Sequence, residues 1–197
     1  MSPPDRPLAP ASWQLDVRGR LIATMALVAS ERGYCSTRVT DVLARARVSR
    51  RTYYVYFKNR DDCFFAAYEA IVAHLMHLIV PSPDRPEQPS LEQALEQVVG
   101  YFGNWPEHAR VLMIEVLSAG PQGIACYERT MAELAERLAR CPRWQPGDCG
   151  LLARAELAQA VLGAMQRMLQ LGITDEGPVP SLVPALIALT TRVELAA

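Results

Sequence analysis

The 197-residue sequence predicts an all-α protein of about nine helices, with a small three-helix unit at its N-terminus and a larger helical bundle after it. Apolar residues recur every three to four positions along most of the chain, which is the period of amphipathic helices. Glycine and proline interrupt this pattern where helices should end, as at Gly33 and in the proline-rich segment 81–89. Half of the residues are hydrophobic, which is enough for a sizeable core.

The N-terminal part is predicted to begin with a disordered arm over residues 1–11, because four prolines fall within it. A first helix then runs from Ser12 or Asp16 to Arg32, with one apolar stripe that covers the helices following it. Gly33 is expected to end this helix as its C-cap.

The stretch from Ser36 to Arg60 predicts two short helices joined by a tight turn, about residues 38–57. The second helix starts with Ser49 as its N-cap, and Tyr53 and Phe57 face the core from it. Its opposite face is basic and aromatic, and carries Arg50, Arg51, Tyr54 and Val55. Because an α-helix fits the major groove and arginine pairs bidentately with guanine, this pattern predicts a helix-turn-helix that reads DNA. The alternative is a solvated helix with a few surface arginines.

The distribution of charge favours the DNA-binding interpretation, although the whole chain carries only −1. Residues 1–60 hold 11 Lys and Arg against 4 acids, a net charge of +7. The remainder holds 20 − 11 = 9 bases and 21 − 4 = 17 acids, a net charge of −8. A basic N-terminal part can approach phosphate while the acidic remainder is repelled from it.

The segment GYCSTRVTDVLARARVSRRTYYVYFKNRDD, residues 33–62, resembles the DNA-binding signature of the tetracycline-repressor (TetR) family. That signature runs Gly-aromatic, a Ser/Thr cap, an Ile-Ala pair, Ala-Gly-Val-Ser, then Tyr-x-Tyr/His-Phe and a basic residue. The matches are Gly33, Tyr34, Thr37, Val42, Ala46, Val48, Ser49, Thr52, Tyr54, Tyr56, Phe57, Asn59 and Arg60. The resemblance implies a helix-turn-helix DNA-binding domain over residues 12–60 and an effector-binding and dimerisation domain over 61–197.

The sequence departs from the signature at several positions. Leu43 stands where the family has Ala, and Arg47 where Gly closes the first of the two short helices. If Arg47 is left-handed there, its backbone costs about 1–2 kcal/mol. Either the turn is opened, or Arg47 gains a phosphate contact when DNA is bound. Arg38 replaces the capping hydroxyl, so the cap is expected to move back to Thr37 or Ser36.

The predicted DNA-binding residues fall into two groups. Arg50, Arg51 and Val55 are expected to meet base edges. Phosphates are expected to be held by Thr37, Arg38, Tyr54, Tyr56, Lys58 and Arg60, the last by resemblance alone, and Ser49 and Thr52 complete the predicted surface.

The remainder of the chain predicts six helices and their loops. Asn59 caps a helix that runs to about Val80 and joins the DNA-binding part to the bundle. Ser90 and Gln93 form a capping box for the next helix. The predicted ranges are 59–80, 90–105, 106–119 as a central buried helix, 122–141, 148–171 and 180–195.

The bundle shows no catalytic constellation, so an enzyme is not expected and no cofactor is implied. It does carry aromatic residues and methionines at scattered positions: Tyr68, Tyr101, Phe102, Trp105, Met113, Tyr127, Met165 and Met168. The resemblance implies that these line a pocket for a small hydrophobic effector, whereas plain core packing is the alternative. It also implies a homodimer through the last two helices, bound to a palindromic double-stranded DNA operator as a ligand-released repressor. A regulator without an effector, or an activator, remains open.

The remaining residues of chemical interest give weaker signals. The five cysteines have no zinc spacing, and their odd number argues against a disulfide framework; a thiol sensor is the alternative to free thiols. His74 and His77 are three apart, but no third ligand is evident, so no metal site is predicted. With no signal peptide or membrane span, the protein is expected to be cytoplasmic.

Overall fold

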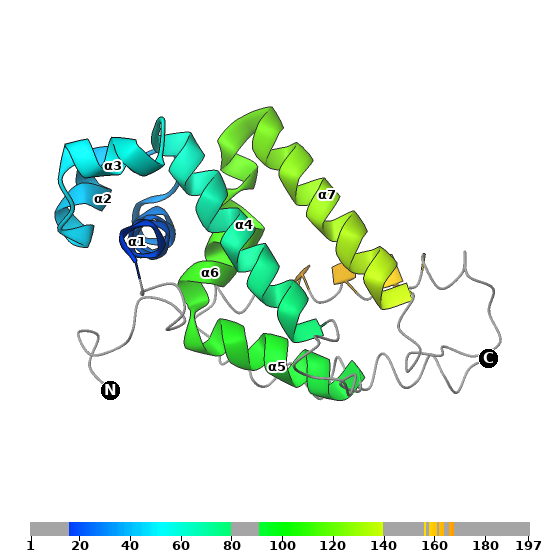
Figure 1. The fold of residues 1–197 in the computed structure, drawn as a ribbon. Coiled ribbons are helices and arrows are strands. Elements are labelled where there is room, and N and C mark those ends of the chain that lie inside the picture. Colours follow the sequence, from blue (N-terminus) through cyan, green and yellow to red (C-terminus); the bar gives the residue numbers. More distant parts are fainter. Residues whose placement is uncertain are drawn as a thin grey trace, which may run out of the picture.

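The computed structural model describes residues 16–79, 91–139 and part of 156–167. Over these residues the chain is helical and contains no strand, so the all-α prediction is confirmed (Figure 1). We call residues 16–59 the head and the described residues from Arg60 onward the body. The predicted arm, the proline-rich segment 81–89 and the last predicted helix, residues 180–195, lie outside the described residues.

Helix α1 (Val17–Arg32) has the predicted ends. The Asp16 side chain caps it by accepting a hydrogen bond from the Gly19 amide at 2.7 Å. Gly33 ends it with φ 81°, and its N–H donates to the Ala29 carbonyl. Positive φ favours glycine because it has no Cβ, which is why the helix stops there.

Helices α2 (Val39–Ala46) and α3 (Arg50–Tyr56) form the predicted helix-turn-helix. The expected cap of α2 by Thr37 or Ser36 is wrong: the N-cap is Arg38, whose guanidinium cannot accept a hydrogen bond. Asp41 compensates, because its carboxylate accepts from the Arg38 amide at 3.1 Å. Ser49 caps α3 as predicted and accepts from the Thr52 amide.

The turn between α2 and α3 is closed by Arg47 in the left-handed conformation, with φ 53° and ψ 45°. The Leu43 carbonyl accepts from the amides of both Arg47 and Val48. The turn is therefore tight rather than opened, at a cost of about 1–2 kcal/mol for a residue with a Cβ.

The body begins with α4 (Arg60–Ile79), which Asn59 caps by accepting from the Asp62 amide at 2.8 Å. Helix α5 (Leu91–Asn104) follows, and then α6 (Pro106–Arg110). The predicted central helix does not stay α-helical to its end. It passes from α6 into the π-helix η3 (Val111–Glu115) and the 3₁₀-helix η4 (Leu117–Ala119). Helix α7 (Gly120–Ala139) completes this part, starting two residues earlier than predicted.

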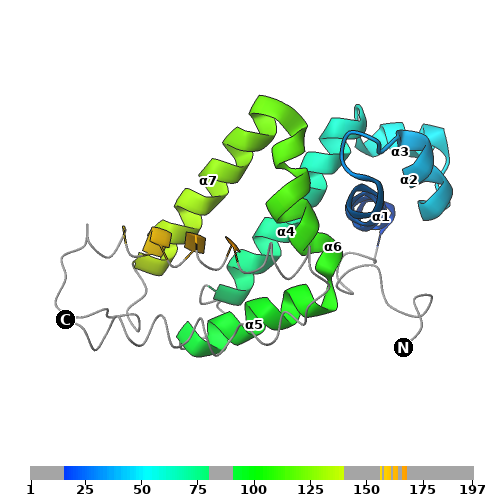
Figure 2. The same cartoon turned by 180° about the vertical axis from the view of Figure 1, so that it is seen from behind.

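The helices pack so that head and body share one core. Helix α4 leads from the head into the body, and α5 crosses its far end (Figure 1). From behind, α6 lies beside α1, with which it makes direct contacts (Figure 2). One cluster of buried residues joins α1 and α3 to α4 and η3, as Leu21, Tyr53, Phe64 and Leu112 illustrate. Packed side chains therefore connect the body directly to the head.

Candidate nucleic-acid interface

Helix α3 has one face in the core and one in solvent, as predicted. Tyr53 is fully buried, and its ring centroid lies 5.6 Å from that of Phe57. On the other face Tyr54 is 45% exposed and Val55 73%. An aliphatic side chain this exposed has no folding role, but it is suited to contact a thymine methyl group.

The arginines on this exposed face have no acidic partners. Within the described part of the chain no ion pair involves Arg38, Arg47, Arg50, Arg51 or Lys58. Arg32 and Arg45 of the head are paired with Asp41 and Glu31, and Arg60 at the start of the body is paired with Asp61. Among the described residues, Arg18 and Arg20 of α1 also have no ion pair. Four of the unpaired bases, Arg47, Arg50, Arg51 and Lys58, lie on α3 or its flanking turns, where they are available to phosphates and bases.

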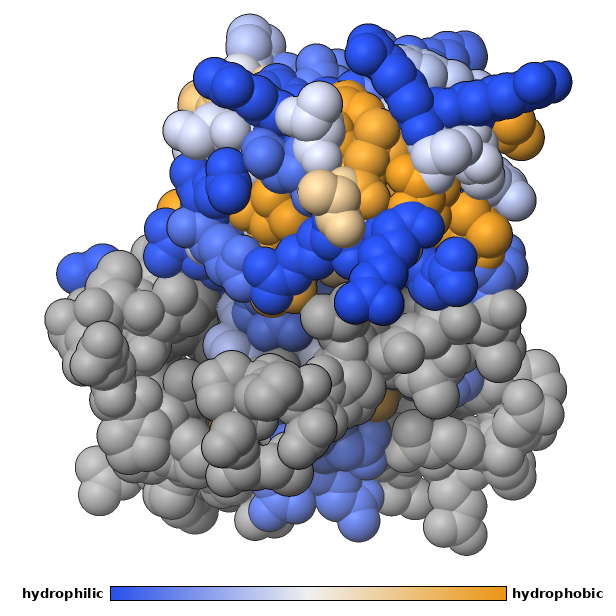
Figure 3. All heavy atoms as spheres, turned by 90° about the vertical axis from the view of Figure 1, so that its left-hand side faces the viewer, coloured by the Kyte–Doolittle hydropathy of each residue, from blue (hydrophilic) through white to orange (hydrophobic). Residues whose placement is uncertain are grey.

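The surface around α3 has the composition of a nucleic-acid-binding face. Viewed from the α2–α3 end, hydrophilic side chains cover much of this part of the molecule, and apolar atoms are exposed between them across its width (Figure 3). The Arg50 guanidinium lies 5.8 Å from the Tyr54 ring centroid, which restricts where it points. Arg47 is exposed, so its side chain is accessible for the phosphate contact that its departure from glycine suggested.

Two residues expected to hold phosphates have internal partners instead. Thr37 is only 2% exposed, and its hydroxyl donates to the Gly33 carbonyl at 2.8 Å. The Arg60 guanidinium lies 4.3 Å from the Tyr34 ring centroid and donates to the Asp61 carboxylate. Both side chains therefore have partners within the protein, and their expected phosphate contacts stay predictions.

The same cluster shifts the acidity of Asp61. Partial burial would raise the pKa of this carboxyl, but hydrogen bonds from Tyr34 and Arg60 and the charge of Arg60 outweigh it and lower the pKa. A lowered pKa means that the ionised carboxylate stabilises the fold above its unfolded pKa near 3.8, and that this contribution is lost as the pH falls below it.

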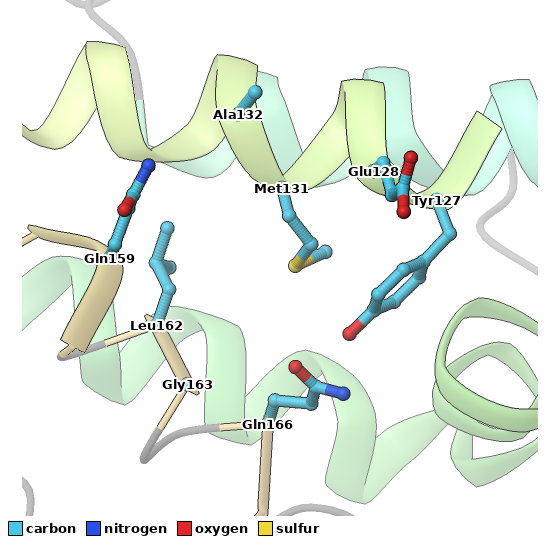
Figure 4. A pocket seen from close by; sticks show the side chains of 8 residues that line it. All are labelled: Tyr127, Glu128, Met131, Ala132, Gln159, Leu162, Gly163 and Gln166. Atoms are coloured by element: carbon cyan, nitrogen blue, oxygen red, sulfur yellow. The ribbon is translucent and has the colours of Figure 1, made fainter. Parts of the chain in front are cut away.

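A pocket of about 300 Å³ lies in the body between α7 and the helical residues around 159–166 (Figure 4). The Tyr127 and Met131 side chains point into it from α7, and Gln166 lies opposite Tyr127. The buried Tyr127 hydroxyl has no hydrogen-bond partner among the described residues. The lining consists of Tyr127, Glu128, Met131, Ala132, Gln159, Leu162, Gly163 and Gln166.

The residues predicted to line an effector pocket are only partly found there. Tyr127 lines it, whereas Tyr68, Tyr101, Phe102 and Met113 are buried in the main core and Trp105 packs against that core. The side chains of Met165 and Met168 lie outside the described residues. These core residues therefore do not line this pocket, and an effector site among them stays a prediction.

Two of these core tyrosines also have hydrogen-bonded hydroxyls. Tyr68 donates to Thr130 Oγ1 at 2.9 Å, and burial raises its pKa to about 12. The Tyr101 hydroxyl lies 2.7 Å from His108 Nδ1.

Cys63 and His74 pack within the protein, whereas Cys35 is an exposed free thiol. Burial raises the pKa of Cys63 to about 12, so this thiol stays protonated and unreactive. The His74 ring lies 4.7 Å from the Tyr101 ring centroid, and burial, followed by the charge of His77, lowers its pKa. Over the described ranges no group of three or more His, Cys, Asp or Glu side chains is placed to hold a metal. No described helix has both the length and the apolarity needed to cross a bilayer.

Comparisons with known proteins agree with this architecture. Residues 21–67 match the family model of bacterial regulatory proteins, tetR family. No curated protein matches the chain significantly. A TerR/AcrR-family transcriptional regulator from Aquifex aeolicus VF5 superposes with a TM-score of 0.70 at 18% identity, covering 92% of this chain and 100% of that one.

Two regulators named FadR have the same fold, and the first of them is described as a fatty acid degradation regulator. FadR from Bacillus halodurans has a TM-score of 0.67 at 17% identity over 88% of this chain and 94% of its own. FadR from Bacillus subtilis, in complex with stearoyl-CoA, has a TM-score of 0.64 at 16% identity over 87% of this chain and 97% of its own. The helix-turn-helix of this chain therefore matches the tetR family model, and the described chain has the fold of these transcriptional regulators.

Proposed function

We propose that the protein is a repressor that binds a palindromic operator as a homodimer and is released from it by a small hydrophobic effector. The observation that carries the DNA-binding part is the exposed face of α3, where Arg50 and Arg51 have no acidic partner in the described structure. The phosphates of duplex DNA would supply the negative charge that these unpaired arginines lack within the protein.

The proposed contacts divide by chemistry. Arg50, Arg51 and Val55 read base edges in the major groove. The phosphate contacts come from Arg38, Arg47, Tyr54, Tyr56 and Lys58, which are all exposed. At the start of α3, Ser49 is exposed and Thr52 is partly buried, and their hydroxyls bond to each other at 2.8 Å.

The DNA-contact proposal predicts which substitutions weaken binding to duplex DNA from upstream of the protein's own gene. Arg50→Ala or Arg51→Ala should cost about 1–3 kcal/mol per half-site and relax sequence preference, because a base contact is lost. Lys58→Ala should weaken binding to all sequences and lower the salt slope by about 0.9 per phosphate contact. Fluorescence anisotropy at several salt concentrations measures both effects.

The matched control is Arg137→Ala, which removes an exposed arginine from α7, where it pairs with Glu133. Its affinity for DNA should equal that of the parent. If Arg50→Ala and Arg51→Ala also bind as tightly as the parent, α3 is not the recognition helix.

The effector proposal rests on the pocket beside Tyr127. A buried hydroxyl without a partner costs roughly 1–3 kcal/mol, which a ligand with a hydrogen-bond acceptor would recover. Met131 and Leu162 offer an apolar surface, and Glu128 disfavours an anion. The stearoyl-CoA complex of Bacillus subtilis FadR is consistent with a long acyl ligand in this fold. These observations favour an uncharged, elongated apolar molecule that ends in a hydroxyl or carbonyl group.

A test of the effector proposal uses 1-dodecanol as a neutral probe. It should raise the melting temperature and, with a coupling of about 1–3 kcal/mol, weaken DNA binding roughly 5- to 150-fold. Met131→Trp, which fills the pocket, should abolish both effects, whereas Ala125→Trp on the exposed part of α7 should preserve them. An unchanged response in Met131→Trp would exclude this pocket as the effector site.

The proposed dimer uses the last two predicted helices, most of which lie outside the described residues. Two recognition helices must then reach major grooves about 34–36 Å or somewhat further apart. Sedimentation of the free protein and of its DNA complex should give two chains, or a multiple of two, per operator. A single chain bound to DNA would exclude the symmetric arrangement.

A further inference from the structure

A buried carboxylate joins the body to the head at a point remote from α3. Glu115, the last residue of η3, is 3% exposed. Its Oε2 accepts a hydrogen bond from the Tyr34 amide at 2.7 Å, across 81 positions of sequence. Its Oε1 accepts from Arg110 Nε at 3.0 Å. A carboxylate is rarely buried to this extent unless its oxygens are hydrogen-bonded, so its position is well defined.

The local backbone on both sides is shaped for this contact. Tyr34 follows the C-cap Gly33 of α1, so its amide is not part of the helical ladder and needs another acceptor. A Cβ at Gly33 would lie 3.6 Å from Glu115 Oε2. On the body side, the Val116 amide donates to the Val111 carbonyl, which is the wide bond of a π-turn. A π-turn adds a residue, so the side chains after it face a different direction from those in an α-helix, and such turns often occur at functional sites.

Tyr34 is held at the same time from α4. Its hydroxyl donates to Asp61 Oδ1 at 2.8 Å, and the Arg60 guanidinium covers its ring. Beside it, the exposed Cys35 thiol approaches the Ser118 carbonyl of η4 at 3.7 Å. The connection between α1 and α2, residues 33–38, is therefore held by η3 and η4 on one side and by α4 on the other.

This connection leads directly into the helix-turn-helix. The Arg60 Nη1 also donates to the carbonyls of Tyr34 and Thr37, and Thr37 immediately precedes the N-cap of α2. A displacement at Tyr34 therefore moves the start of α2, and α3 follows because the α2–α3 turn is closed.

We infer that Glu115 is a positioning residue for DNA binding, which sets the orientation of α2 and α3 by holding the Tyr34 amide. The Glu115–Tyr34 contact also connects η3 to the head. A rearrangement of α6 and α7 would therefore displace the recognition helix through η3 as well as through α4. The inference rests on DNA binding through α3 but not on the effector pocket. Glu115 touches no DNA itself, so it acts on the geometry of the head and not on its charge.

The test compares Glu115→Ala with variants that keep parts of the contact. Glu115→Ala removes the acceptor, and Glu115→Asp keeps the charge but is one methylene too short to reach Tyr34. The double variant combines Glu115→Gln with Arg110→Gln. The glutamine at position 115 restores an uncharged acceptor for the Tyr34 amide, and the glutamine at position 110 provides it with an uncharged side-chain partner. For each variant we measure hydrogen exchange at the Tyr34 amide and the melting temperature. We also measure DNA affinity at several salt concentrations.

For Glu115→Ala we expect exchange at Tyr34 to accelerate at least about tenfold, while the amides of buried α1 residues keep their protection. DNA affinity should fall about tenfold, the scale of one lost buried hydrogen bond, with an unchanged slope of log K against log[salt], because no phosphate contact is lost. Glu115→Asp should behave in the same way, and the double variant should recover affinity to within about threefold.

Different results separate the failure of this inference from the failure of DNA recognition by α3. If Tyr34 exchanges freely in Glu115→Ala or Glu115→Asp but DNA affinity equals that of the parent, the contact is only structural. If the salt slope falls, the carboxylate acts through charge, and the inference is overturned. If Arg50→Ala also leaves binding unchanged, the failure lies in the assignment of α3. Should Glu115→Ala unfold, Glu115→Asp and the double variant give the same comparison.

Discussion

Replacing Gly123 with alanine is expected to destabilise the protein by at least about 3 kcal/mol, by overpacking a corner that has no room for a methyl group. Gly123 is buried in the first turn of α7, where the chain folds back against η4. A Cβ there would lie 1.9 Å from the Val116 carbonyl oxygen and 2.9 Å from Ala119 Cβ. Because the closer atom belongs to the backbone, no change of side-chain rotamer relieves the overlap, and the corner itself has to open.

The measurement is the melting temperature at fixed protein concentration, with an expected fall of about 6–12 °C for a chain of this size. The matched control is Gly100→Ala within α5, where a Cβ would meet nothing within 4 Å. That change should stabilise the protein by about 0.5–1 kcal/mol, because alanine is the better helix former. Equal effects of the two substitutions would show that the α7 corner is not closely packed in solution.

Tyr53→Ala is expected to cost about 3–5 kcal/mol and to abolish DNA binding, because it removes the residue that anchors α3. Tyr53 is fully buried between Tyr54 and Phe57, at ring-centroid distances of 5.4 and 5.6 Å. Its hydroxyl donates to the Asn59 carbonyl at 3.0 Å, beyond the end of α3. The alanine variant loses both the packing and the link between α3 and the start of α4.

The adjacent tyrosine provides the control. Tyr54 is 45% exposed, so Tyr54→Ala should leave the melting temperature nearly unchanged while weakening DNA binding. Tyr53→Phe should lose only about 1 kcal/mol, the hydroxyl contribution. Thermal unfolding and anisotropy on the three variants distinguish the residues. If Tyr53→Ala and Tyr54→Ala destabilise equally, the two faces of α3 have been assigned wrongly.

Local features of the chain could be predicted from the sequence because their causes lie within a few residues. Gly33 ends α1, and Ser49 and Asn59 begin α3 and α4, since each cap concerns backbone groups three or four positions away. The two faces of α3 follow from helical periodicity in the same way. The length of the central helix could not be predicted, because the π-turn at Val111–Glu115 depends on packing against α1 and α4.

Thus the sequence alone determined the helix-turn-helix, its exposed arginines and the family resemblance, which all depend on short-range order. Tertiary structure alone decided that Arg60 packs on Tyr34 rather than facing outward, and that most of the predicted pocket residues fill the core. It also placed Glu115 against the Tyr34 amide. The physical reason is that a polar side chain takes whichever partner the fold brings near, and partners 26 or 81 residues away leave no periodic trace in the sequence.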